Sequence, residues 1–314
     1  MKFNTKLIHG NLKTDETGAT NTPLHLSNAF AHNAAEKLEK VINLNTKIVF
    51  GETLGNPKLD VLDIEEVAKV CNKHNIIFIV DSTITTPFII RPIEYGADIV
   101  IHSTSKYING TSNSIGGIIV DGGSSKYKDI KYKNFSEYYK KFGKMAYTAK
   151  LRNTVGKDIG ASLAPFNAFL NLTGIETLAL RMREHNTNTL AVAEFLSSNS
   201  KVTSVNYPSL PSSKYYNIAQ KYYKNGASGV LTFRLGSKEN AFKFINNLKM
   251  ILNITNIGDT KTLIIHPAST ICASNTFDEK EQMGVYDDLL RLSVGIEDIE
   301  DILGDIEGAM SSIK

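Results

Sequence analysis

Short apolar runs alternate with an amphipathic segment in the first half of the chain. "KIVF" is followed by three continuous apolar runs, typical of strands that are covered on both faces: "IIFIV", "ADIVIHS" and "GGIIVDGG". "DIEEVAKVCNKH", between "KIVF" and "IIFIV", has apolar residues at helical spacing and acids near its start. This alternation of strand, helix and strand predicts parallel α/β layers.

The second half of the chain has a mixed pattern. Residues 160–199 are expected to form two helices, the second long and amphipathic. Beyond them, strands and helices are predicted in turn, ending with a strand at "LLRLSVGIE" and a helix at "DIEDILGDIEGAMSSI". We therefore expect three parts: an N-terminal arm and junction (residues 1–46), an α/β domain (47–185) and an α+β domain (186–314).

Composition excludes few classes of protein. The 314 residues are 42% hydrophobic and 21% charged with a net charge of +3, which is ordinary for a soluble globular protein. The lysine-rich stretch 126–144 interleaves aromatics, but no nucleic-acid-binding motif accompanies it, so a solvated insertion is the simpler interpretation. Two cysteines without disulfide or metal spacing, no apolar leader and no membrane-length run predict a cytoplasmic protein with neither a nucleic acid nor a membrane as partner.

Polar residues end two of the apolar runs. Asp81 follows "IIFIV", and Ser103, Ser105 and Lys106 follow "ADIVIH". Ligands of open α/β sheets sit at the carboxyl ends of strands. The two serines are two residues apart, so in extended backbone they face the same way. We therefore expect a carboxylate, two hydroxyls and an amine to converge on one ligand.

Pyridoxal 5′-phosphate (PLP) has a group for each of these side chains. A lysine amine bonds to its aldehyde, hydroxyls bind its phosphate, and a carboxylate keeps its ring nitrogen protonated. Another interpretation is a phosphohydrolase that uses Asp81, because "IIFIVD" is like the acidic strand of P-loop enzymes, although GxxxxGK[ST] occurs nowhere in the chain.

Several segments resemble the Cys/Met-metabolism (transsulfuration) family of PLP enzymes. They are "ETLGNPKLDVLDIEEVAKVCNKH", "VDSTITTPFIIRPIEYGADIVIHSTSKYINGTSNSIGG", "IGASLAPFNAFLNLTGIETLALRM", "GDTKTLIIHPAST" and "LLRLSVGIED". The resemblance runs from about residue 47 to the C-terminus, with a short match at "TKLIHG…TPLHLSNAF". It implies a fold-type-I PLP-transferase-like α/β fold: a mainly parallel, cofactor-binding sheet domain (47–185) with a smaller C-terminal α+β domain.

The resemblance also implies a role for eight residues. The cofactor contacts would be made by Asn56, Asp81, Thr83, Ser103, Ser105 and Lys106, and the substrate carboxylate would be bound by Arg291 and Ser269. Of these, Lys106 would carry the covalent bond to PLP and act in catalysis, and Asp81 would hold the ring nitrogen. No metal ion is expected.

Within the family, the chain is most similar to the subgroup that replaces the acetate of O-acetyl-L-homoserine with sulfide or methanethiol. The expected partners are this amino-acid substrate, a sulfur donor and further copies of the chain, as a dimer of dimers. Methionine γ-lyase or cystathionine γ-synthase activity is the alternative reaction. A non-catalytic paralogue that lacks part of the cofactor pocket is the alternative from another class.

One part of the resemblance is interrupted. Family members carry roughly a hundred further residues where this chain has only "AHNAAEKLEKVINLN", so the cofactor domain is incomplete. Either the protein has this stretch as a mobile segment outside the printed sequence, or the stretch is truly deleted. We prefer the first explanation, because a deletion would expose apolar strands. The site would then order when PLP binds, and a crystal without that order would hold no cofactor.

Overall fold

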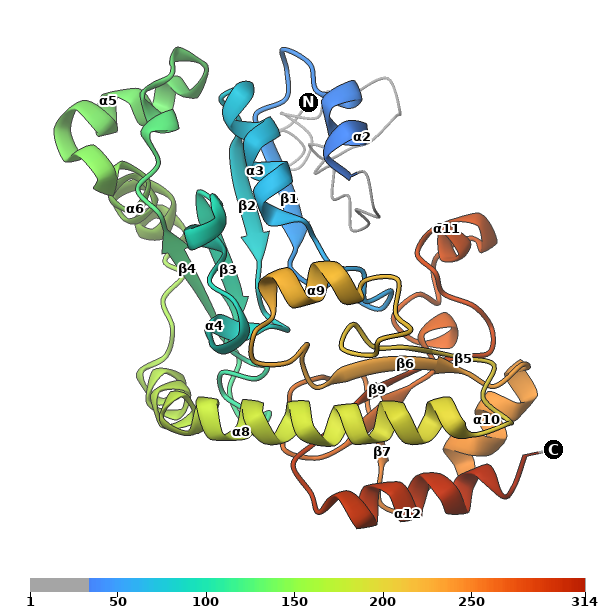
Figure 1. Cartoon of the computed structure of the whole chain (residues 1–314). Coiled ribbons are helices and arrows are strands. Elements are labelled where there is room, and N and C mark those ends of the chain that lie inside the picture. The colour runs from blue at the N-terminus through green and yellow to red at the C-terminus, as the bar shows by residue number, and fades with distance from the viewer. Residues whose placement is uncertain (1–33, 314) are drawn as a thin grey trace, which may run out of the picture.

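The computed structural model describes residues 34–313 and places them around two sheets (Figure 1). The N-terminal sheet has four strands in the order β1-β2-β3-β4, and the C-terminal sheet has five in the order β5-β6-β9-β8-β7. The long helix α8 (Pro165–Ser198) runs from the first region along the second.

The first region follows the predicted alternation of elements. Its strands are β1 (Ile48–Glu52), β2 (Ile77–Asp81), β3 (Ile99–Ser103) and β4 (Gly117–Asp121). Its helices are α2 (Ala34–Val41), α3 (Ile64–Lys73), α4 (Thr86–Ile89), α5 (Lys133–Phe142), α6 (Ala146–Leu151) and α7 (Lys157–Ile159). The parallel arrangement is confirmed for β1, β2 and β3, but β4 is antiparallel to β3. The link over residues 104–116 contains turns rather than the crossover helix that a parallel neighbour needs.

The prediction that the apolar run at β4 is covered on both faces is wrong. Ile118, Ile119 and Val120 are 43–49% exposed, because β4 is the last strand of its sheet among the described residues. The aromatic side chains of the lysine-rich insertion pack instead on other strands of the same sheet, against Ile77 of β2 and Ile99 of β3.

The second region alternates strands and helices. Its strands are β5 (Ser204–Asn206), β6 (Val230–Arg234), β7 (Leu252–Asn253), β8 (Leu263–Ile265) and β9 (Leu289–Ser293). Its helices besides α8 are α9 (Tyr216–Tyr222), α10 (Lys238–Asn247), α11 (Phe277–Gln282) and α12 (Ile299–Met310). Strand β9 lies between β6 and β8, antiparallel to both, and all five of its residues are buried.

The prediction of two helices over residues 160–199 is wrong, because α8 is one helix of 34 residues. Gly174 does not end it. A Cβ at Gly174 would lie 2.5 Å from the carbonyl oxygens of Ile108 and Asn109, so the glycine lets the helix approach this backbone closely.

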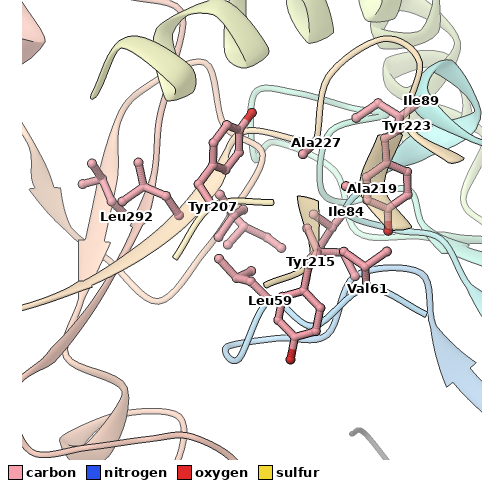
Figure 2. Packing of buried hydrophobic residues seen from close by; sticks show 14 of the residues in the cluster. Leu59, Val61, Ile84, Ile89, Tyr207, Tyr215, Ala219, Tyr223, Ala227 and Leu292 are labelled. Carbon is pink, nitrogen blue, oxygen red and sulfur yellow. The ribbon is translucent and has the colours of Figure 1, made fainter. Parts of the chain in front are cut away.

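Both regions share one hydrophobic core. A single cluster of buried residues includes Leu59, Val61 and Ile84 from the first region, and Tyr207 and Leu292 from the second (Figure 2). The expected boundary at residues 185 and 186 falls inside α8, and this division into domains stays a prediction.

Candidate active site

The carboxyl ends of β1, β2 and β3 bring polar side chains to one face of the N-terminal sheet. Glu52 pairs with Asp81 in the register of β1 and β2, and Asp81 pairs with Ile101, two residues before Ser103. Since side chains two apart share a face, Glu52, Asp81 and Ser103 lie on the same side. Thr83 joins them: its backbone N–H donates to Oδ1 of Asp81 at 2.8 Å, and its Oγ1 accepts from the N–H of Ser103 at 2.8 Å.

The chain turns immediately after Ser103. The backbone N–H of Gly110 donates to the carbonyl of Lys106 at 2.8 Å, so Lys106 lies in a turn. The expectation of extended backbone from Ser103 to Ser105 is therefore wrong. The Oγ of Ser105 accepts from the N–H of Gly116 at 3.0 Å and donates to its carbonyl at 3.3 Å, which ties the turn to the start of β4.

The Lys106 amine reaches across to the C-terminal region. Its Nζ donates to Oδ1 of Asn256, in the loop between β7 and β8. Burial first, and then the positive charge of Arg291, lower the pKa of Lys106. A lowered pKa leaves more of the amine neutral, which is the form that attacks a carbonyl carbon.

Arg291 lies at the centre of the buried strand β9 and is 3% exposed. Its Nη1 donates to Oδ1 of Asn56 at 2.9 Å, and its Nη2 donates to the carbonyl of Asn256 at 3.2 Å. Its Nε is buried without a hydrogen-bond partner among the described residues. Burial lowers the pKa of Arg291 to about 10, so the side chain is still a cation at neutral pH. A buried cation with an unused N–H is suited to bind a carboxylate.

Ser269 follows β8 in the 3₁₀ turn η6 (Pro267–Ser269). Its Oγ is 2.8 Å from Nδ1 of His266, and His266 in turn contacts the carbonyl of Asp287 at 2.7 Å. The structure therefore brings Asn56, Lys106 and Arg291 together through hydrogen bonds. The hydroxyl of Ser269 is instead hydrogen-bonded to His266. The role of Ser269 at a substrate stays a prediction.

Sequence reasoning missed two residues of this site, Glu52 and Asn256. Glu52 accepts a hydrogen bond from the N–H of Asn56 at 3.0 Å. Burial raises the pKa of Glu52 to about 7, and the charges of Asp81 and Asp60 add to the rise. An acid after an apolar run was the signal that singled out Asp81, and Glu52 follows the run "KIVF" with only Gly51 between them. Asn256 carried no comparable signal, because it lies in a loop between two short strands.

These residues fit pyridoxal phosphate. A half-buried amine with a lowered pKa suits its aldehyde, and the Asp81 carboxylate at a strand end suits its ring nitrogen. The orphaned Nε of Arg291 suits the carboxylate of an amino acid. Within residues 34–313, His, Cys, Asp and Glu side chains form no group of three that could hold a metal ion. The fold and the site together define a PLP enzyme of fold type I.

Comparison with known proteins agrees with this class. The pattern of the Cys/Met metabolism PLP-dependent enzyme family matches residues 32–311. The chain therefore belongs to this family, and the fold class expected from the sequence is confirmed.

Similar proteins include two named enzymes and one solved structure. O-acetyl-L-homoserine sulfhydrylase of Leptospira meyeri is 42% identical, over 88% of this chain and 67% of that protein. Homocysteine/cysteine synthase of Saccharomyces cerevisiae is 39% identical, over 88% and 68%. The structure of an O-acetylhomoserine (thiol)-lyase of Campylobacter jejuni, which contains N′-pyridoxyl-lysine-5′-monophosphate, matches with a TM-score of 0.84 at 37% identity, over 88% of this chain and 69% of that one.

The chain thus spans about two thirds of the length of these relatives. Across residues 34–313, none of the helices combines the length and the apolar character that a membrane crossing requires.

Proposed function

We propose that this protein catalyses the PLP-dependent γ-replacement of acetate in O-acetyl-L-homoserine by sulfide or methanethiol. The observation that carries the proposal is one connected set of hydrogen bonds. Lys106 contacts Asn256, Asn256 contacts Arg291, and Arg291 contacts Asn56. A reactive amine and a carboxylate-binding cation are thereby held side by side, as a reaction at the α-carbon of an amino acid requires. The names of the relatives support the choice of O-acetylhomoserine as the amino acid.

The cofactor would be held by the residues at the ends of β1 to β3. Bound pyridoxal phosphate supplies an aldehyde for an amine and a ring that stabilises negative charge on the substrate carbon. Lys106 would bind the aldehyde, and Asp81 would keep the ring nitrogen charged. The contacts to the rest of the cofactor are assigned to Asn56, Thr83, Ser103 and Ser105.

Arg291 would orient the substrate. Its planar fork binds a carboxylate with two parallel hydrogen bonds, which fixes the α-carbon relative to Lys106. The Lys106 amine would then move protons at the α- and β-carbons, and its lowered pKa favours the neutral form that accepts a proton. Ser269 is the second candidate for the substrate carboxylate.

The protein is further proposed to act in the cytoplasm as a homo-oligomer, a dimer of dimers. An exposed apolar surface supports the oligomer: Phe166, Phe169, Leu172 and Leu180 on α8 are 62–69% exposed. Phe169→Glu should reduce the mass measured by light scattering. Phe277→Glu on α11, where the phenylalanine is 79% exposed, is the matched control and should leave the mass unchanged.

The reaction is tested by incubating the purified protein with pyridoxal phosphate, O-acetylhomoserine and sulfide. The expected result is homocysteine formed in equal amount to the acetate released, together with the visible absorbance band of lysine-bound pyridoxal phosphate. Homocysteine without added sulfide is not possible by this route, so 2-oxobutyrate and ammonia under that condition would indicate elimination instead. Absence of both the band and turnover would favour the non-catalytic paralogue.

A further inference from the structure

A chain of side-chain hydrogen bonds leads away from the Lys106 amine. The Oδ1 of Asn256 accepts from Lys106, and the Nδ2 of Asn256 donates to Oγ of Ser112 at 2.7 Å. Ser112 in turn contacts Oδ2 of Asp259. The chain therefore ends on a carboxylate that is 5% exposed.

The charge of Asp259 is stabilised where it lies. Burial alone would raise the pKa of Asp259, but hydrogen bonds from Ser112 and Lys261 outweigh burial, and the pKa lies below its usual range. The backbone N–H of Lys261 donates to Oδ1 at 3.0 Å, and its Nζ lies 3.3 Å from the same oxygen. Asp259 is thus a carboxylate at neutral pH, which accepts hydrogen bonds and cannot donate them.

This charge fixes the direction of every bond in the chain. Because Asp259 only accepts, the hydroxyl proton of Ser112 points to it, and the lone pairs of Ser112 are left for Asn256. Asn256 must then present its NH₂ to Ser112 and its oxygen to Lys106. A flipped carboxamide would set NH₂ against the lysine amine, with an acceptor facing an acceptor at Ser112.

The loop that carries Asn256 and Asp259 is pressed against the lysine segment. Gly258 has φ +74°, and a Cβ there would lie 2.6 Å from the backbone nitrogen of Tyr107. The N–H of Thr260 donates to the carbonyl of Gly110 at 2.9 Å, and the N–H of Gly258 donates to Oγ of Ser293 at 3.0 Å. These contacts hold the loop at Gly258 and Thr260, on either side of Asp259, so the Asp259 carboxylate keeps its position relative to the lysine segment.

We infer that Asp259, acting through Ser112 and Asn256, is a positioning residue that directs a hydrogen-bond acceptor at the Lys106 amine whenever that amine is free. An acceptor favours the protonated amine and leaves its remaining N–H groups or lone pair directed away from Asn256. Asn256 also accepts from Arg291 through its backbone carbonyl, so the same residue sets the place of both groups. The inference rests on the proposed role of Lys106 as the reacting amine.

The test measures the amine itself in the cofactor-free protein. Trace acetic anhydride labels neutral amines, and mass spectrometry gives the labelling of Lys106 as a function of pH. In Asp259→Asn the new NH₂ donates to Ser112. The donor and acceptor roles along the series of hydrogen bonds then reverse, and Asn256 presents its NH₂ to Lys106. The protonated amine is then disfavoured, so labelling at a fixed pH below its midpoint should rise about three- to tenfold. Asn256→Asp places a carboxylate beside the amine and should move the midpoint the opposite way, to higher pH.

Asp288→Asn is the matched control. Asp288 is also 5% exposed and in the same region, but its carboxylate accepts from Arg234 at 2.7 Å, away from the chain. Labelling of Lys106 should be unchanged in this variant, even where its unfolding temperature falls. Equal labelling in wild type, Asp259→Asn and Asp288→Asn would overturn the inference, and so would an unmoved midpoint in Asn256→Asp.

The outcomes separate this inference from the proposed reaction. Shifted labelling in a protein that never turns over O-acetylhomoserine would support the positioning role and refute the function. Turnover in wild type, with Lys106 labelling that is unchanged in Asp259→Asn, would support the function and refute the positioning role.

Discussion

Strands β9 and β4 are both five residues long and both apolar, yet β9 is buried at every position while four of the five residues of β4 are exposed. The difference lies in their neighbours. Strand β9 has a strand on either side, whereas within residues 34–313 β4 pairs with β3 alone. A continuous apolar run therefore predicts both a strand and other protein packed on its faces. Where that packing is absent, as on β4, we expect further protein to pack on the strand. We call the N-terminal sheet, which ends in the exposed strand β4, the incomplete sheet, and the C-terminal sheet, which is built around the buried strand β9, the complete sheet.

The two sheets also contribute differently to the site. The incomplete sheet offers reactive groups at its strand ends, while the complete sheet holds a cation in the middle of a buried strand. Substitutions in each sheet test whether this difference holds.

Replacing the amine of the incomplete sheet should have the largest effect. Lys106→Ala removes the group that is proposed to bond to the cofactor and transfer protons, so turnover should fall by several orders of magnitude with the unfolding temperature unchanged. Steady-state rates and thermal unfolding measure the two properties. Lys73→Ala, where the lysine side chain is 67% exposed, is the control. Wild-type turnover in Lys106→Ala would refute the assignment.

The lysine-rich insertion should stabilise the part of the incomplete sheet on which it packs. Lys126 pairs with Asp98 at 2.7 Å, and both side chains are 8% exposed. Lys126→Met leaves Asp98 buried without its partner, which should cost about 3–5 kcal/mol of unfolding free energy. Lys221→Met removes the pairs with Asp63 and Glu65, in which the lysine is 40% exposed, and should cost about 1 kcal/mol or less. Equal losses in urea denaturation would show that the insertion does not anchor the sheet.

A matched pair of isoleucines compares the two sheets directly. Ile264 on β8 is 0% exposed and Ile119 on β4 is 49% exposed. Ile264→Ala should lower the unfolding free energy by about 2–5 kcal/mol, because it leaves a cavity. Ile119→Ala should lower it by about 0.5 kcal/mol or less in dilute protein. A large loss at Ile119 would mean that β4 is covered in solution, and repeating the measurement across protein concentrations would reveal cover by a second copy.

The cation of the complete sheet should affect substrate binding more than it affects folding. Arg291→Lys keeps the charge but loses the planar fork, so kcat/KM for O-acetylhomoserine should fall about ten- to a hundredfold, mostly through KM. Steady-state kinetics at fixed sulfide measure it. A change below about threefold would mean that another residue binds the carboxylate.

The smallest effect is expected from Glu52, as a dependence of stability on pH. Its pKa in the folded protein is raised from 4.5 to about 7, so its contribution to stability is fully present below pH 4.5 and is lost as pH rises through about 7. Glu52→Gln cannot ionise and should avoid this loss, gaining roughly 1–2 kcal/mol over wild type above that window. Denaturation on both sides of the window measures the difference. A constant difference across pH would contradict the raised pKa.

Residues marked by a local pattern could be predicted from the sequence, and residues placed by distant contacts could not. Asp81 and Ser103 follow apolar runs and do lie at strand ends, and Arg291 lies on a predicted strand. Asn256 reaches Lys106 from 150 positions away through a loop without periodicity. The extended backbone expected at Ser105 failed because the turn is stabilised by Gly116, a partner that the local pattern does not reveal.

The shared core bears on how substrate reaches the site. Leu59 and Ile84 pack in one cluster with Tyr207 and Leu292 (Figure 2), so the two regions are joined by apolar contacts directly beside the strand ends. A hinge motion that separated the two regions would expose that cluster to water. Large hydrophobic interfaces of this kind oppose such a motion. We therefore expect the two regions to keep their relative placement while small molecules bind.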